Sequence, residues 1–149
     1  MRYIYIVIVS YFFMVSKNLL ELIIKDQLKE FKAIQQTTPR EKLAESLAYK
    51  GKNALIIKGV RRCGKSTLLK QIIDARFENN FLYFNFDDER IEEFKAINFQ
   101  ILMESLYEIL GRKENLFFDE IQNITAWELF VNRMLREANR VFITGSNSN

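Results

Sequence analysis

The sequence predicts an α/β fold built on a parallel β-sheet, and three observations lead to this prediction. Short apolar runs alternate along the chain with segments whose apolar residues recur at helical spacing. A glycine-rich phosphate-binding motif stands where one apolar run meets the next such segment. The 149 residues are 48% hydrophobic and 28% charged, a composition typical of one globular domain that can bury a core.

Two helices are expected before the first strand. In residues 18–31 the apolar positions follow a helical period. Residues 38–41, Thr-Pro-Arg-Glu, have the pattern of a capping box with Pro39 at the first helical position. The second helix should end near Lys50, with Gly51 as its stop.

Four apolar runs should form the strands. They are predicted at residues 54–57, 81–86, 116–118 and 141–144. A helix should follow the first strand, and a helical region in two pieces should lead to Leu110. A further helix should begin at Trp127 and bury an apolar stripe as far as Ala138. Strands joined by helices in this way predict a parallel sheet.

The N-terminal run at residues 3–15 is almost wholly apolar. It is shorter than the roughly 20 residues that a membrane-spanning helix needs, and no small-residue cleavage site follows it. Three interpretations stay open: translation that starts at Met14, an added β-strand, or a weak membrane anchor. We therefore expect a separate run over 1–15, N-terminal helices over 16–51 and a main domain over 52–149.

Composition excludes several classes of function. Lysine and arginine number 22 against 19 acidic residues, and this net charge of +3 is too small by itself to indicate nucleic acid. The absence of histidine excludes histidine acid–base catalysis and histidine metal sites. The single cysteine, Cys63, excludes an internal disulfide and makes a reducing cytoplasm the expected compartment.

The motif G-x-x-x-x-G-K-[ST] occurs in full at residues 59–66. Its glycines let backbone N–H groups approach a phosphate, and the following helix adds the positive end of its dipole. Lys65, the expected catalytic lysine, should reach the β- and γ-phosphates of a nucleotide, while Ser66 ligates Mg²⁺. Thr67 should lie near the α-phosphate. The expected nucleotide-binding residues are Gly59, Val60, Arg61, Arg62, Cys63, Gly64, Lys65, Ser66 and Thr67.

Acidic and hydroxyl side chains follow two later strands. Asp119 and Glu120 come directly after the third apolar run, where a buried acid is costly unless it serves a cation. Asp119 is expected to complete the Mg²⁺ shell with Ser66, and Glu120 to polarise the attacking water. Ser146, or as second choice Thr144, should orient that water from the end of the fourth strand; an ordinary strand-ending turn is the alternative.

Several of these residues have a second interpretation. Arg61 and Arg62 could add positive charge near the nucleotide or could simply be solvated. Cys63 could be an oxidation-sensitive thiol near a helix N-terminus, or only a small residue that fits the loop. The acidic residues 87–89 could join the metal shell, or could cap a helix.

Four blocks of the sequence together resemble the AAA+ ATPases. They are Gly-Val-Arg-Arg-Cys-Gly-Lys-Ser-Thr-Leu-Leu, Phe-Asn-Phe-Asp-Asp-Glu-Arg, Phe-Phe-Asp-Glu-Ile-Gln and Ile-Thr-Gly-Ser-Asn. The residues of these four blocks are similar to those of a family of predicted archaeal and bacterial ATPases. Members of that family typically carry a C-terminal domain thought to be nuclease-like. The resemblance covers roughly residues 18–149. It implies a three-layer P-loop fold with core strand order 1-4-3-2, and ATP and Mg²⁺ as ligands.

The resemblance also implies parts that this sequence lacks. It ends shortly after the fourth strand, without the family's fifth core strand, helical lid, sensor arginine and arginine-finger region. We therefore expect a truncated ATPase module, weakly active alone, which a separately encoded lid segment or an oligomer neighbour could complete. The alternative is a non-catalytic nucleotide-binding remnant or partner-binding module. Nucleic acid as a partner rests on family analogy alone, and a membrane is not expected.

Overall fold

The computed structural model describes residues 15–35, 38 and 42–146. These residues form one four-stranded sheet in which all neighbouring strands are parallel. Its strands are β1 (Leu55–Gly59), β2 (Leu82–Asn85), β3 (Asn115–Asp119) and β4 (Arg140–Ser146). The strand order is β1-β4-β3-β2, which confirms the order expected from the resemblance.

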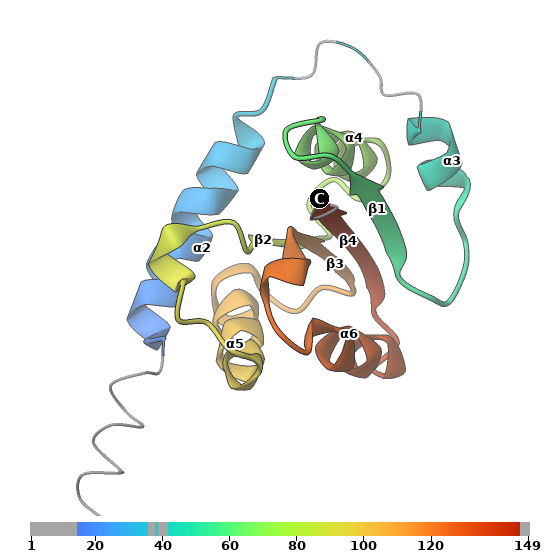
Figure 1. The fold of residues 1–149 in the computed structure, drawn as a ribbon. Helices are drawn as coiled ribbons and strands as arrows, with labels where there is room; N and C mark the ends of the chain where they lie inside the picture. The colour runs from blue at the N-terminus through green and yellow to red at the C-terminus, as the bar shows by residue number, and fades with distance from the viewer. Residues whose placement is uncertain (1–14, 36–37, 39–41, 147–149) are drawn as a thin grey trace, which may run out of the picture.

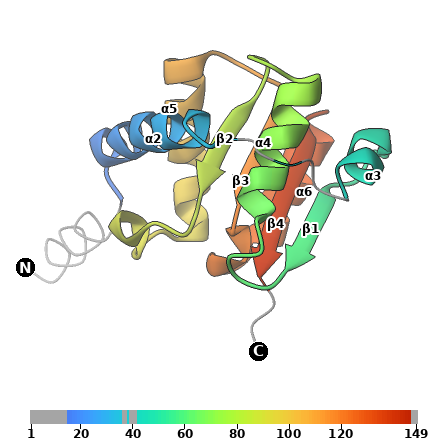
Figure 2. The same ribbon diagram turned by 90° about the horizontal axis from the view of Figure 1, so that it is seen from above.

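Helices cover both faces of the sheet and make three layers (Figure 1). The helices are α2 (Lys17–Lys32), α3 (Leu43–Ala48), α4 (Lys65–Arg76), α5 (Phe99–Leu110) and α6 (Trp127–Arg136). Short 3₁₀ turns are η1 (Glu89–Ile91), η2 (Ala96–Asn98) and η3 (Ile121–Asn123). Figure 2 shows α4 in front of the sheet, α3 to the side beyond β1, and α5 behind the sheet. The expected helical region in two pieces therefore becomes η1, η2 and α5.

The core is divided between the two faces because successive side chains of a strand point to opposite sides. Every residue of β3 is buried. Leu116 and Phe118 pack into the cluster that includes α5 and α6, while Phe117 packs into the cluster that includes α4. Phe117 also stacks on Phe142 of β4, with ring centroids 4.4 Å apart. A strand that is buried on both faces has a continuous run of apolar residues, which is the pattern that predicted β3.

Helix α2 closes the outer edge of the sheet beside β2. The Ser16 hydroxyl caps the helix by accepting the backbone N–H of Leu19 at 3.2 Å. The buried Gln27 side chain donates to the Asn85 carbonyl and accepts the Asn85 N–H, both at 2.9 Å. Gln27 thus satisfies backbone groups of the edge strand as another strand would.

Helix α3 is shorter than expected. It ends at Ala48, and Tyr49 is already extended, with its hydroxyl donating to the Asn53 carbonyl at 2.9 Å. The helix thus ends two residues before Lys50, near which its end was expected, and Tyr49 bonds forward into the next loop. The expected capping box at 38–41 and the apolar run at 3–15 lie largely outside the described residues.

Two further expectations are corrected at the surface. Helix α6 ends at Arg136, and Ala138 lies beyond it, exposed and with a φ of +64°, so the buried stripe stops before Ala138. Strand β1 lies at the edge of the sheet, and its Ile56 is 47% exposed rather than buried. Trp127, by contrast, packs against the core as its place in the stripe predicted.

Within the described part of the chain, no helix has both the length and the apolar character needed to cross a membrane.

Candidate nucleotide-binding site

The phosphate-binding motif forms a tight loop between the end of β1 and the start of α4. The Cys63 N–H donates to the Val60 carbonyl at 3.3 Å, and Gly64 has a φ of +88°, which glycine adopts at no steric cost. A Cβ at Gly59 would lie 2.7 Å from the Cys63 sulfur. Gly64 thus takes a backbone conformation that favours glycine, and Gly59 leaves room for the Cys63 side chain.

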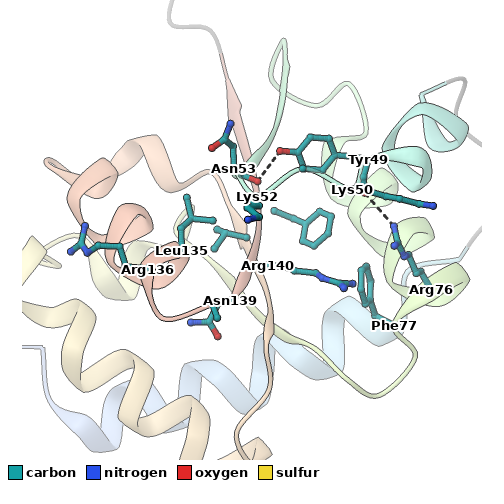
Figure 3. A pocket seen from close by; sticks show the side chains of 14 residues that line it. Tyr49, Lys50, Lys52, Asn53, Arg76, Phe77, Leu135, Arg136, Asn139 and Arg140 are labelled. Carbon is teal, nitrogen blue, oxygen red and sulfur yellow. Dashed lines mark hydrogen bonds between the residues drawn. The ribbon is translucent and has the colours of Figure 1, made fainter.

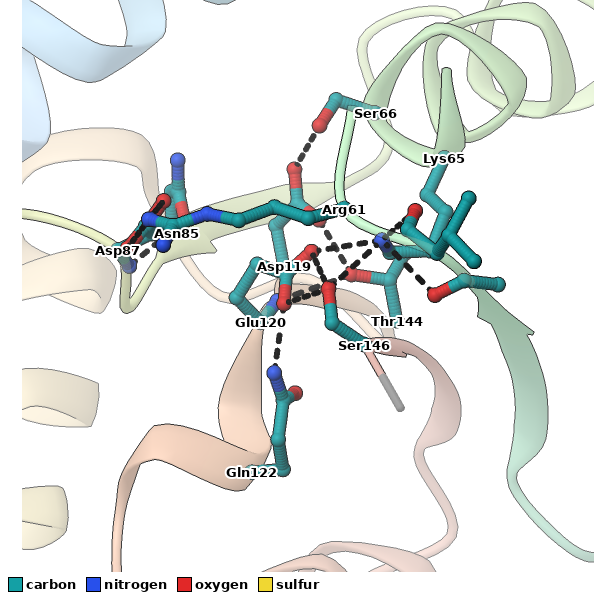
Figure 4. A network of polar contacts seen from close by, with 12 residues as sticks. Arg61, Lys65, Ser66, Asn85, Asp87, Asp119, Glu120, Gln122, Thr144 and Ser146 are labelled. Atoms are coloured by element: carbon teal, nitrogen blue, oxygen red, sulfur yellow. Dashed lines mark hydrogen bonds and ion pairs between the residues drawn. The ribbon is translucent and has the colours of Figure 1, made fainter. Parts of the chain in front are cut away.

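Lys65 is the first residue of α4 and points its side chain back under the loop (Figure 4). It is 5% exposed, and its ammonium donates to the Val60 carbonyl at 3.1 Å and to the Ser146 hydroxyl at 2.9 Å. The same nitrogen lies 3.0 Å from a carboxylate oxygen of Glu120. The expected catalytic lysine is therefore held by groups from β4 and from the residue that follows β3.

Asp119 ends β3 and is fully buried. Hydroxyl groups of Ser66, Thr144 and Tyr83 all donate to its carboxylate, the Tyr83 hydroxyl at 3.1 Å. Burial raises the pKa of the Asp119 carboxyl above its usual value, although the three hydroxyls favour the charged form. Burial beside Asp119 likewise holds the pKa of Tyr83 well above its usual value.

Glu120 stands one residue later in the left-handed backbone region, with a φ of +52°. Its backbone N–H donates to the Thr144 hydroxyl at 2.9 Å. Its carboxylate accepts from Gln122 at 2.6 Å and from Ser146 at 2.8 Å. Burial alone would raise the pKa of Glu120, but the bonds from Gln122, Lys65 and Ser146 together outweigh it and hold the pKa below the usual value.

The donor set beside the loop suits a magnesium ion. Ser66 and Asp119 present a hydroxyl and a carboxylate that already touch, and hard oxygen ligands of this kind are those that Mg²⁺ takes from proteins. No group of three or more His, Cys, Asp and Glu side chains able to hold a metal occurs among the residues described. A magnesium site needs no such group, since it is completed by waters and phosphate oxygens.

The remaining motif residues face solvent or the helix. Val60, Arg61, Arg62 and Cys63 are exposed, and Thr67 is half-buried in α4. The Arg61 guanidinium pairs with the Asp87 carboxylate at 2.9 Å across the mouth of the site.

The acidic run after β2 behaves as a cap. The Asp88 side chain accepts the Arg90 N–H at 3.1 Å and caps η1, so this carboxylate takes the capping role and does not join Asp119.

Thr144, the second choice for orienting the water, is 1% exposed, and its hydroxyl is shared between Asp119 and the Glu120 N–H.

Two residues of the site, Tyr83 and Gln122, are not among those expected from the sequence. Tyr83 reaches Asp119 only because β2 and β3 are neighbours in register. Gln122 lies two residues after Glu120 and turns back to it through η3. A polar residue so close behind an acidic pair is a signal that could have singled out Gln122.

The sequence of the chain is similar to known proteins. A family model described as "AAA domain" matches residues 51–149. Uncharacterized proteins of Methanocaldococcus jannaschii and Haemophilus influenzae are 43% identical over 93 residues and 37% identical over 101 residues. A second uncharacterized protein of Methanocaldococcus jannaschii is 30% identical over 136 residues.

The matches cover 62%, 63% and 85% of this chain but only 21%, 25% and 28% of the three relatives. The chain therefore spans less than a third of their length. No solved structure matches the chain.

Proposed function

The chain belongs to the AAA domain family, and from this premise we propose that it binds Mg-ATP and hydrolyses it. The family makes the chain an ATPase-like module. The proposal goes further by giving roles to individual residues. The chain covers less than a third of each relative. The activity, substrates and partners of a whole protein are therefore proposals as well.

One observation carries the proposal. Lys65 and Ser66 from the loop lie against Glu120 and Asp119 from the end of β3, at the carboxyl edge of a parallel sheet (Figure 4). Ligands bind at this edge in open α/β sheets. A cation, a hydroxyl and two carboxylates gathered there match the parts that phosphoryl transfer to water needs.

Each residue then has a definite task. The loop N–H groups and the Lys65 ammonium bind the phosphates, while Ser66 and Asp119 hold the metal. Mg²⁺, when bound, neutralises charge on the β- and γ-phosphates. Glu120 accepts a proton from the attacking water, and Ser146 fixes the carboxylate that does so. Thr144 acts as a positioning residue, because its hydroxyl joins Asp119 to the Glu120 backbone.

A second candidate is nucleotide binding without turnover. The observation in its favour is that Glu120 is fully engaged by Lys65, Ser146 and Gln122. Both oxygens of this carboxylate already accept from these groups, so a water must compete with them. Withdrawal of Lys65 towards a bound nucleotide, or a lid segment supplied by a separate chain or an oligomer neighbour, would release an oxygen.

Calorimetric titration of Mg-ATP into the purified protein tests the binding step, with Lys65→Ala as the matched variant. We expect saturable binding that the variant loses. Absence of binding in both folded proteins would overturn the proposal. Binding with no phosphate release by the wild-type protein would favour the second candidate.

A further inference from the structure

A second cavity lies at the opposite edge of the sheet from the nucleotide site. Its volume is about 570 Å³, against about 270 Å³ for the one beside Ser66. It is bounded by the loop after α3, the ends of α4 and α6 and the start of β4 (Figure 3). This is the amino edge of the strands, so the cavity shares no residue with the phosphate-binding loop.

The lining of this cavity carries positive charge without any acidic residue. Its cations are Lys50, Lys52, Arg76, Arg136 and Arg140. In Figure 3 the Arg140 side chain extends towards Phe77, whereas Arg136 is directed away from the others. Other basic side chains of the described chain, such as Lys17 and Arg90, pair with carboxylates.

Helix ends cannot neutralise this charge. Helices α4 and α6 both end at the cavity, and each C-terminus carries roughly half a negative charge. Arg76 is further held by the carbonyl of Leu47 at 2.9 Å. Because Arg136 is directed away, the two helix ends offset about one of the remaining four positive charges. The positive charge that remains favours binding of a ligand that carries negative charge.

We propose that this cavity binds the backbone of a single-stranded nucleic acid. Arginine and lysine together match phosphates, arginine through a planar fork of donors. The cavity has the volume of a site for one small ligand, so it admits one or two nucleotides of a single strand and excludes a duplex. Its apolar floor, formed by Leu135, Val141 and Phe142, offers contact area for a sugar or base.

The lining favours a nucleotide over an acidic protein segment because it offers aromatic and apolar side chains beside its cations. Lys50 and Lys52 come from the loop, Arg76 from α4 and Arg140 from β4. Phe77 and Phe142 can contact a base, while the cations meet the phosphate. The inference does not depend on the proposed ATPase activity.

Fluorescence anisotropy of a labelled twenty-residue oligo-dT tests the proposal, at several salt concentrations and without ATP. The test variant is Lys52→Glu with Arg140→Glu, two exposed residues at the cavity. We expect affinity to fall at least about tenfold, and the salt slope to decrease by about 0.7 for each lost phosphate contact. Circular dichroism checks that the variant is folded.

The control variant changes the net charge by the same amount on another surface of the protein. Lys25→Glu with Lys29→Glu alters two exposed lysines on α2 and should leave affinity within about twofold. Equal losses in the α2 control, or no binding at low salt, would each overturn the proposal. The proposal would also be overturned if the protein bound a labelled poly-glutamate peptide saturably but did not bind the oligonucleotide.

Discussion

The ammonium of Lys65 lies 3.0 Å from a carboxylate oxygen of Glu120, and the two side chains are only 4% and 15% exposed. Each buried charge is compensated by the other, so removing either would leave its partner unpaired. The same ammonium is the group proposed to bind nucleotide phosphates. Arrival of a nucleotide would therefore draw Lys65 away from Glu120 and free a carboxylate oxygen for water.

Replacing Glu120 with glutamine should separate binding from hydrolysis. The amide cannot accept a proton from water, so we expect the single-turnover rate of ATP hydrolysis to fall by about 10²–10⁴-fold. Affinity for Mg-ATP should be equal or higher, because Lys65 no longer has a charged competitor for the phosphates. Rapid quench and calorimetry measure the two quantities.

The control for that experiment is Glu93→Gln, the same chemical change at an exposed residue. It should alter neither quantity. An unchanged hydrolysis rate in Glu120→Gln would remove Glu120 from the mechanism, whatever the affinity.

A methyl group at Gly59 should damage the loop in a way that a second substitution repairs. The new Cβ would meet the Cys63 sulfur at 2.7 Å, so we expect Gly59→Ala to weaken nucleotide binding at least about tenfold through displacement of the loop. In Gly59→Ala with Cys63→Ala the sulfur is gone, and the next atom lies 3.9 Å away. Calorimetry should then show most of the affinity restored. Failure of the double variant to recover would mean that the clash is not the cause.

Thr144 should matter mainly for stability and geometry. Thr144→Val leaves a buried oxygen of Asp119 and the Glu120 N–H without their partner, at a cost of about 1–3 kcal/mol in the free energy of unfolding. Thr144→Ser keeps the hydroxyl and should cost about 1 kcal/mol or less for the lost methyl group. Urea denaturation compares the two, and equal losses would contradict the hydrogen-bonding role.

Acid should weaken the junction between α2 and the loop after β2. Hydrogen bonds from Arg90, with help from Gln27, hold the pKa of Asp88 at about 2, below the ordinary value of 3.8. A carboxyl whose pKa is lowered on folding stabilises the protein above pH 3.8, and this contribution is lost as the pH falls towards 2.

Asp88→Asn should therefore lower the free energy of unfolding at pH 6 by about 1–2 kcal/mol. The difference from the wild-type protein should shrink below pH 3. The neighbouring Asp87→Asn breaks only an exposed pair with Arg61 and should cost less than about 1 kcal/mol. A difference for Asp88→Asn that did not change with pH would show that the effect is not electrostatic.

The limits of sequence-based prediction are visible at the helix ends. The strands lie within two residues or so of their predicted positions, because each is a compact apolar run. Helix α3 ends at Ala48, where Tyr49 turns extended and its hydroxyl bonds to Asn53, and α6 ends before Ala138, which takes a positive φ. Such endings depend on contacts that no helical period contains.

The sequence by itself determined the strand–loop–helix unit around Gly59 and Lys65, since glycine positions and spacing within one segment specify that geometry locally. The strand order came through the family resemblance. Only the tertiary structure decided which side chains meet, because β4 lies between β1 and β3 in the sheet. That insertion brings Ser146 to Lys65 across 81 positions of sequence. Pairing between distant strands, unlike a loop motif, leaves no mark within any one segment.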